Sequence, residues 1–228
     1  MNNSSTVYLF DLWKTLGYSI DRDPIFDVQE MLGHNVIVEG SARAQADPDF
    51  ARLCLTTDIR DPRKFLDFLA AAVGRTASAE AHSAFAVLRA RETSGFGIYD
   101  DSLPALKALK KSGARLGLIS NLWPFPVEHI FEGNGLGRYF EHRIYSFDVG
   151  FVKPDPEIFR EAQELFRVAP EDCVMIGDNP VADIDGALAV GMRAALIDRS
   201  GKARLDKPGA VVIGSLLDLL SPDLWTRG

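Results

Sequence analysis

Short runs of apolar, β-branched and aromatic residues recur along the chain and predict buried strands. The run at residues 6–11 is almost continuously apolar and ends in a carboxylate. Strands of parallel sheets have this pattern because helices cover both of their faces. Further runs that we expect to form strands lie at residues 114–120, 142–147, 173–178 and 193–198, with a weaker one at 210–213.

Apolar residues at helical spacing lie between these runs. We expect Ser102 and Asp155 to cap helices, because short polar side chains bond the free N–H groups of a first turn. Pro156 suits the first position of the second helix, and Pro180 opens a third. The apolar faces predicted for the three helices are Leu103, Leu106 and Leu109; Ile158, Phe159, Ala162, Leu165 and Phe166; and Ile184, Ala187 and Leu188. Strands that alternate with such helices predict right-handed β-α-β crossovers and a doubly wound parallel α/β sheet.

Residues 17–96 interrupt this alternation, and we expect an inserted lobe that is helical throughout. One amphipathic helix is predicted to begin after Asp61, and a second follows it. The apolar positions expected on their buried faces are Phe65, Phe68, Leu69 and Ala72, and Ala81, Ala84, Phe85 and Leu88. The chain is therefore predicted to have a core of residues 1–16 and 97–228 and a helical cap of residues 17–96.

The composition limits the classes of function. The chain has 228 residues, 46% of them hydrophobic, and a formal net charge of −7. We expect no binding of nucleic acid, because a phosphate backbone requires a basic protein face. No apolar run reaches the roughly 18 residues of a membrane span, so no membrane partner is expected. Cys54 and Cys173 cannot form a disulfide framework, and the first residues lack the layout of a secretory signal, so we expect a cytoplasmic protein.

Polar residues follow the predicted strands, and these are the candidates for chemistry. Doubly wound sheets bind ligands at the carboxyl ends of their strands, where the connections diverge. The side chains expected at this edge are Asp11, Ser120, Asn121, Lys153 and Asp178. Apart from Asp11, each has an ordinary explanation as a turn, surface or capping residue. Asp11 follows a dry apolar run, where a carboxylate needs a partner, and the whole set in one topology predicts a site.

These residues and their order resemble the motifs of the haloacid dehalogenase superfamily, whose members are mostly phosphatases. The segment from Asp11 to Thr15 matches in part an Asp-x-Asp-x-Thr motif at the end of a strand. Ser120 matches the second motif, and residues 150–156 match a Gly-x-x-Lys-Pro-Asp-Pro motif in full. The fourth motif, Gly-Asp followed by another aspartate, is matched by Gly177, Asp178 and Asp183. The inserted helices lie where enzymes of this family carry their first cap.

The resemblance implies a nucleophile and a metal site. Asp11 would attack the substrate and form a covalent intermediate that water then hydrolyses. Asp11, Asp178 and the main-chain carbonyl of Trp13 would supply oxygen ligands to Mg²⁺, which prefers hard donors. Asp183 would brace this site or hold a metal-bound water.

The resemblance also implies how a small anionic substrate is bound. Lys153 would neutralise the substrate and the charge that develops on it, and Ser120 would hydrogen-bond a phosphoryl oxygen. Asn121 and nearby main-chain N–H groups would join Ser120. An enzyme of this kind is expected to be a monomer or a homodimer.

Trp13 departs from the first motif, because most phosphatases of the family have a second aspartate there as general acid and base. An indole N–H cannot protonate a leaving alcohol, and general acid–base catalysis contributes about 10²–10⁴-fold. The main-chain ligand at this position survives the change, and the intact Gly177 and Asp178 pair favours a metal site. We therefore expect a Mg²⁺-dependent phosphatase of a small phosphate ester that is slow on unactivated esters.

Three other functions stay open. Dehalogenases of the family carry an aromatic residue at the position of Trp13 and use no magnesium, and Arg43 is a candidate cap cation for a haloacid carboxylate. Phosphonate-cleaving members also lack the second aspartate and use a cap lysine, for which this cap offers Lys64. A non-catalytic binding protein would keep the fold and an anion pocket, although the retained set of costly charges argues against it.

Two further residues near the motifs carry open interpretations. Lys14 stands where the family more often has glycine, and its side chain either approaches the anion site or, as we favour, points to solvent. Trp123 is expected to pack a loop above the site. A stack between Trp13 and Trp123 would give the pocket an apolar roof.

Overall fold

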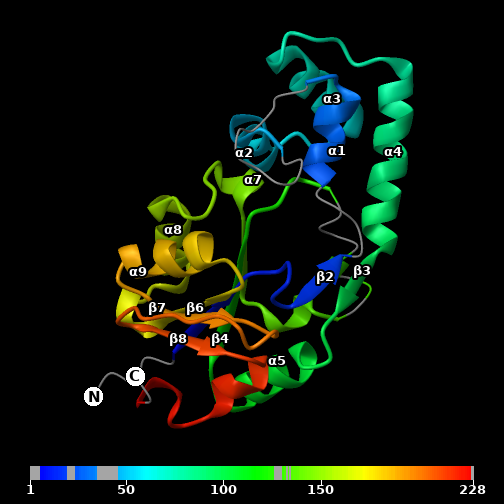
Figure 1. Cartoon of the computed structure of the whole chain (residues 1–228). Coiled ribbons are helices and arrows are strands. Elements are labelled where there is room, and N and C mark those ends of the chain that lie inside the picture. The colour runs from blue at the N-terminus through cyan, green and yellow to red at the C-terminus, as the bar shows by residue number, and fades with distance from the viewer. Residues whose placement is uncertain are drawn as a thin grey trace.

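A six-stranded parallel sheet forms the centre of the protein in the computed structural model (Figure 1). The structure describes residues 6–19, 24–34, 46–125, 130–131, 133 and 135–226. In spatial order the strands are β5 (His142–Tyr145), β4 (Arg115–Ser120), β1 (Val7–Phe10), β6 (Cys173–Gly177), β7 (Arg193–Ile197) and β8 (Ala210–Ile213). Every neighbouring pair is parallel, which confirms the predicted doubly wound α/β class.

The strands are apolar on both faces because each face packs against helices. In β1, Leu9 belongs to one hydrophobic cluster and Phe10 to the other, since successive side chains of a strand point to opposite faces. Helix α5 (Ser102–Lys111) contributes Leu106 to the cluster of Phe10. Helix α8 (Pro156–Phe166) contributes Phe159 to the cluster of Leu9. The two helices therefore cover opposite faces of the sheet.

The strand order reverses beside β1, and this fixes where a ligand can bind. From β1 the chain passes to β4 and then β5 on one side, and it returns to β6 on the other side. A crevice forms at the carboxyl ends of the strands where such an order reverses. Asp11 follows β1, and Asp178 follows β6.

Several predicted helix details are wrong at the level of single side chains. Ser102 does not cap α5: Asp101 is at the N-cap, and the Ser102 hydroxyl donates to the carbonyl of Leu16 at 2.8 Å. Asp155 precedes α8 but caps no N–H of that helix, because its carboxylate accepts from the N–H of Val152 and is paired with an arginine. Leu165, which we expected to be buried, is 39% exposed.

The remaining connections in the core are short. The helix expected at Pro180 begins as a π-helix, η3 (Pro180–Asp185), and continues as α9 (Gly186–Ala189). Such π-helical segments often occur at functional sites. The other short helices are α7 (Ser146–Val149) and the 3₁₀ helices η1 (Gly137–Tyr139), η2 (Pro170–Asp172), η4 (Leu216–Leu220) and η5 (Leu224–Thr226).

Four helices between β1 and β4 form a separate cluster away from the sheet (Figure 1). They are α1 (Pro24–Met31), α2 (Pro48–Thr56), α3 (Pro62–Ala72) and α4 (Ala79–Ser94). The expectation of a wholly helical insert is wrong at its base, where β2 (Gly17–Ser19) pairs with β3 (Phe96–Ile98) in an antiparallel ribbon. These three-residue strands are too short for a detectable alternation. The division into a core of 1–16 and 97–228 and a cap of 17–96 stays a prediction.

The segment after β4 reaches into the cluster of cap helices. Trp123 and Phe125 are buried in the same hydrophobic cluster as these helices. The centroids of their rings lie 5.0–6.1 Å from those of Phe65 on α3 and Phe85 on α4. The expectation that Trp123 packs a loop is confirmed. The predicted stack with Trp13 is wrong, because Trp13 instead meets Phe96 edge-on at 5.3 Å.

No helix in the described part of the chain is long and apolar enough to cross a membrane. Both cysteines in the sequence, Cys54 and Cys173, are buried free thiols. Burial raises the pKa of the Cys173 thiol to about 12.

The buried face of α3 differs from the predicted one and provides a test of the cap. Phe65 is fully buried, whereas Phe68 is 39% exposed. We expect Phe65→Ala to lower the free energy of unfolding by about 3–5 kcal/mol, because it leaves a cavity among packed rings. Phe68→Ala is the matched control on the same helix and should cost less than about 1 kcal/mol. Urea unfolding followed by circular dichroism measures both, and equal losses would contradict this packing.

Candidate active site

Asp11 lies at the centre of the site, directly after β1. Its main-chain N–H donates to the carbonyl of Ile176 at 2.8 Å, which extends the pairing of β1 with β6. Its Oδ1 atom accepts two bonds, from the Ser120 hydroxyl at 3.0 Å and from the Lys153 Nζ at 2.7 Å. The carboxylate is buried, so these donors supply the partners that its position after a dry strand requires.

Lys153 connects two carboxylates below the surface. Its Nζ atom donates to Asp11 Oδ1 and also to Asp183 Oδ1 at 2.5 Å, and its side chain is 2% exposed. Asn121 fixes the backbone of this lysine, because its amide donates to the Lys153 carbonyl at 3.0 Å and accepts from the Lys153 N–H at 2.8 Å. Of the predicted residues, Ser120 and Lys153 thus reach the Asp11 carboxylate, whereas Asn121 contacts the main chain of Lys153.

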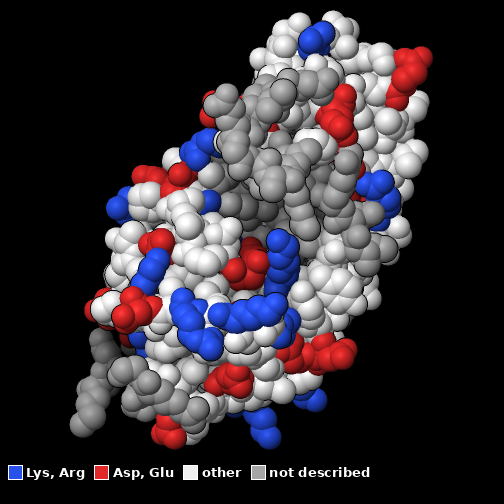
Figure 2. All heavy atoms as spheres, viewed as in Figure 1, with Lys and Arg blue, Asp and Glu red and all other residues white. Residues whose placement is uncertain are grey.

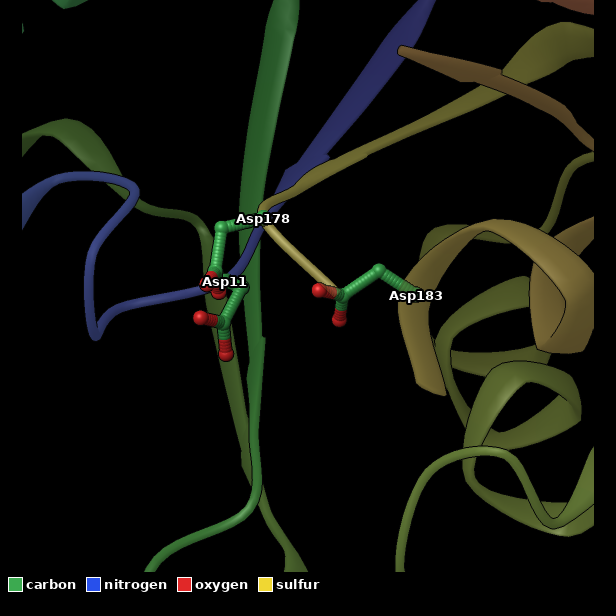
Figure 3. Close-up of side chains that lie close together, drawn as sticks. All are labelled: Asp11, Asp178 and Asp183. Atoms are coloured by element: carbon green, nitrogen blue, oxygen red, sulfur yellow. The ribbon is translucent and has the colours of Figure 1, made fainter. Parts of the chain in front are cut away.

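Three carboxylates face one another at the ends of β1 and β6 (Figure 3). One oxygen of each of Asp11, Asp178 and Asp183 lies within 4.8 Å of the others. Asp183 is held from both sides, since its Oδ2 atom also accepts from the N–H of Asn179 at 2.9 Å. Gly177 makes this approach possible, because a Cβ atom there would lie 2.1 Å from Asp183 Oδ2.

Burial and charge together perturb the titration of these groups. Burial raises the pKa of Asp11 to about 6, against the lowering effect of Lys153. Burial and the nearby Asp183 raise the pKa of Asp178, whereas Lys14 lowers it. Burial alone would lower the pKa of Lys153, but the carboxylates of Asp11 and Asp183 outweigh it and hold that pKa above its usual value.

The donor set fits a hard divalent cation. Three carboxylates face a single ammonium, so the cluster carries excess negative charge in a partly dehydrated place. Mg²⁺ prefers such oxygen donors and retains several waters. Asp11 and Asp178 would hold the ion. Asp183, whose two oxygens already accept hydrogen bonds, would brace the site, and the proposed ligand role of the Trp13 carbonyl stays a prediction.

The turn after Asp11 departs from the pattern expected of a proton donor. Trp13 is half-buried against Phe96, at the base of the cap. Lys14 adopts a left-handed backbone conformation with φ of 58°, and its N–H donates to the carbonyl of Gly17 at 2.6 Å. Its side chain is exposed, as we expected, and it also lines a pocket beside Asp178.

Two other sequence candidates have different outcomes. Lys64, the cap lysine considered for phosphonate cleavage, is exposed on the first turn of α3, as expected for a solvated lysine. Arg43, the candidate cap cation for a haloacid, lies outside the described residues.

Two arginines that bind the segments next to the site were not predicted from the sequence. Arg52 on α2 forms a bidentate ion pair with Asp155 at 2.6 and 3.2 Å, two residues from Lys153. Arg199 after β7 donates to Asp101 at 2.8 Å and to the carbonyl of Thr15 at 2.9 Å. These partners are about a hundred or more residues apart in sequence, and neither Arg52 nor Arg199 belongs to a motif, so spacing gave no indication of the two contacts.

Comparison with known proteins identifies the family. Residues 7–191 match the model of the haloacid dehalogenase-like hydrolases, which is most of the chain. The chain belongs to this family. It is accordingly a hydrolase, and the resemblance seen in its four motifs is confirmed.

Individual relatives point to two activities within the haloacid dehalogenase-like family. A phosphoserine phosphatase of Thermus thermophilus is 38% identical over 109 residues, which are 48% of this chain and 44% of that relative, so the match spans less than half of its length. A 2-haloacid dehalogenase from Pseudomonas syringae has a TM-score of 0.66 at 27% identity, over 98% of this chain and 99% of its own. A HAD phosphatase from Thermococcus onnurineus has a TM-score of 0.62 at 26% identity, over 94% and 95%.

Gly177 allows a test of the carboxylate cluster that does not depend on turnover. We expect Gly177→Ala to displace Asp183 and to weaken Mg²⁺ binding about 10–100-fold, the usual effect of losing a group that orients metal ligands. Gly214→Ala is the control, because a Cβ atom there would meet nothing nearer than Asp218 Oδ2 at 3.9 Å. The readout is the rise in Tm with added Mg²⁺. An unchanged Mg²⁺ dependence in Gly177→Ala would contradict the assignment of the cluster.

Proposed function

We propose that this hydrolase is a Mg²⁺-dependent phosphatase that acts on a small phosphate ester through an aspartyl-enzyme intermediate. The observation that carries the proposal is Asp178, whose carboxylate completes an oxygen cluster with Asp11 and Asp183. Clustered carboxylate oxygens are the donors that Mg²⁺ prefers. The phosphatase names of two matched relatives support the same class.

The hydrogen bonds of Asp11 leave one oxygen for attack. Ser120 and Lys153 both donate to Oδ1, and no hydrogen bond to Oδ2 is found among the described residues. Oδ2 would form a bond to phosphorus while the bond from phosphorus to the leaving oxygen breaks. Water then cleaves the acyl phosphate, which releases inorganic phosphate and restores the carboxylate.

The other residues stabilise charge and hold the nucleophile. Lys153 and Ser120 orient Asp11 and stand close enough to bond a phosphoryl oxygen as negative charge develops on it. Mg²⁺, when bound, supplies further charge neutralisation for the phosphoryl group. Asn121 holds the Lys153 backbone, and Asp183 holds the Lys153 ammonium.

A 2-haloacid dehalogenase is the second candidate, favoured by Trp13 and by the likeness to the Pseudomonas syringae enzyme. Asp11 would then attack carbon and displace halide, which leaves without a proton. The missing acid would be no handicap in that reaction. The carboxylate of Asp178 is the feature that this candidate leaves without a role.

The cellular setting and the assembly are also proposals. A cytoplasmic location is supported by the two free cysteines, which suit a reducing compartment. We propose a small anionic substrate as the ligand and a monomer or homodimer as the assembly.

Hydrolysis of 4-nitrophenyl phosphate is the first test, because its leaving group departs with little need for protonation. We expect turnover that is abolished by a chelator and reduced at least about 10³-fold in Asp11→Asn, which removes the nucleophile. The exposed Asp206→Asn serves as the matched control and should retain activity. If the protein does not hydrolyse this ester but releases halide from a 2-haloacid, the result contradicts the phosphatase proposal and supports dehalogenation. If it acts on neither compound, the result favours a binding protein.

Trp13→Asp tests whether the missing carboxylate limits the rate. Restoring an acid at this position should raise turnover of an unactivated alkyl phosphate by up to about 10²–10⁴-fold, with a much smaller effect on 4-nitrophenyl phosphate. Trp13→Phe, which keeps an aromatic contact with Phe96 but adds no acid, is the control. Urea unfolding of each variant checks that the fold is retained. An equal gain on both esters would show that the effect is not one of leaving-group protonation.

A further inference from the structure

A pocket of about 540 Å³ adjoins the carboxylate cluster at the carboxyl ends of β6 and β7. Asp178 belongs both to the cluster and to the wall of this pocket. The segment after β7, which includes Arg199 and Lys202, also lines the pocket, and so does Lys14 in the turn after β1. Figure 2 shows lysine and arginine atoms gathered around acidic atoms on this face, although the chain as a whole is acidic.

The wall of the pocket is held in place by internal bonds. Asp198 accepts from the N–H and hydroxyl of Ser200 at 2.9 and 2.6 Å, and from the N–H groups of Lys202 and Ala203 at 2.7 and 2.5 Å. The guanidinium of Arg199 lies 3.9 Å from the ring centroid of Tyr99. A segment fixed in this way keeps its shape without a ligand.

The charges in the wall are not equally available to a ligand. Arg199 is paired with Asp101, and the Asp198 carboxylate is occupied by four donors from its own loop. Lys14 and Lys202 are exposed, and neither forms a salt bridge within the described part of the chain. Two ammonium groups therefore remain for a ligand in this pocket.

The rest of the lining limits what such a ligand can be. Leu196, Ile197 and Pro180 also line the pocket and give it apolar surface beside the cationic side chains. An ester whose phosphoryl group lies at Asp11 can therefore extend a short carbon chain past Asp178 and place a second charge beside the lysines. A neutral leaving group would make no charge contact with either lysine.

We propose that Lys14 and Lys202 form a second anion subsite, so that the preferred substrate is a small phosphomonoester carrying another anionic group on its leaving alcohol. This inference rests on the proposed phosphatase function and specifies its substrate class. A carboxylate and a second phosphoryl group share the required chemistry. Both lysines act on binding of the leaving group and take no part in bond cleavage.

The test compares esters that differ in one charge. Phosphoglycolate and its carboxamide, 2-phosphonooxyacetamide, have nearly the same shape, and ethylene glycol bisphosphate replaces the carboxylate by a phosphoryl group. The specificity is expressed as the ratio of kcat/KM for the charged ester to kcat/KM for the carboxamide. In Lys14→Gln/Lys202→Gln we expect this ratio to fall roughly tenfold, which is the loss expected from two partly exposed charge contacts. The fall should come from a higher KM for the charged ester. The charged ester with the larger fall identifies the natural anion.

Lys107→Gln/Lys111→Gln is the matched control, because it removes two exposed lysines of α5 that do not line the pocket. Its ratio should equal that of the wild type. The inference is overturned if the pocket variant keeps the wild-type ratio for both charged esters, or if the control lowers it equally.

A binding measurement separates this inference from the proposed function. Calorimetry measures the binding of phosphoglycolate with Mg²⁺ to Asp11→Asn, with and without the further substitutions Lys14→Gln/Lys202→Gln. Weaker binding to the protein that carries Lys14→Gln/Lys202→Gln supports the subsite even if the wild type hydrolyses no ester, in which case the phosphatase proposal alone fails. Equal binding in both proteins, or none in either, overturns the subsite.

Discussion

The buried ammonium of Lys153 between Asp11 and Asp183 is the interaction on which the site depends. Removing charges from water costs several kcal/mol per ion, and only close, well-directed partners offset that cost. The 2.7 and 2.5 Å contacts supply them, and removal of Lys153 would leave two carboxylates in a dry place without their shared cation. Asp11, Lys153 and Asp183 therefore form one electrostatic unit.

The two loops that complete this unit also contact the cap. The segment that carries Ser120 and Asn121 continues into Trp123, which is buried among the rings of α3 and α4. The segment that carries Lys153 is bound to α2 through Asp155 and Arg52. A displacement of α2, α3 or α4 would thus act directly on the two loops whose side chains bond Asp11. Direct contacts therefore join the helices α2, α3 and α4 to the loops around Asp11.

The sheet could be predicted from the sequence, because buried parallel strands are continuous apolar runs. Asp11, Lys153 and Asp178 could be predicted as neighbours, because they follow these runs at the spacing of the motifs. It was insufficient for side chains whose role depends on distant partners. Ser102 and Asp155 have the local pattern of caps, but each makes its principal bond to a residue that only the tertiary structure brings near. The exposure of Phe68 was not predicted, because a small rotation of a helix leaves its apolar pattern unchanged. The β2–β3 ribbon was not predicted, because three-residue strands are too short to show an alternation of apolar and polar residues.

Trp13 and the cationic pocket impose complementary constraints on the leaving group. With an indole against Phe96 in place of an acid, the departing oxygen receives no proton from the first motif, so its negative charge must be stabilised in another way. Lys14, the next residue, brings an ammonium to the pocket that Asp178 lines, where it opposes the rise in the pKa of that carboxyl that burial causes. In place of a proton donor, the turn after Asp11 thus presents an apolar contact and an exposed positive charge. This arrangement favours leaving groups that depart readily without a proton and that carry an anion for the ammonium to bind.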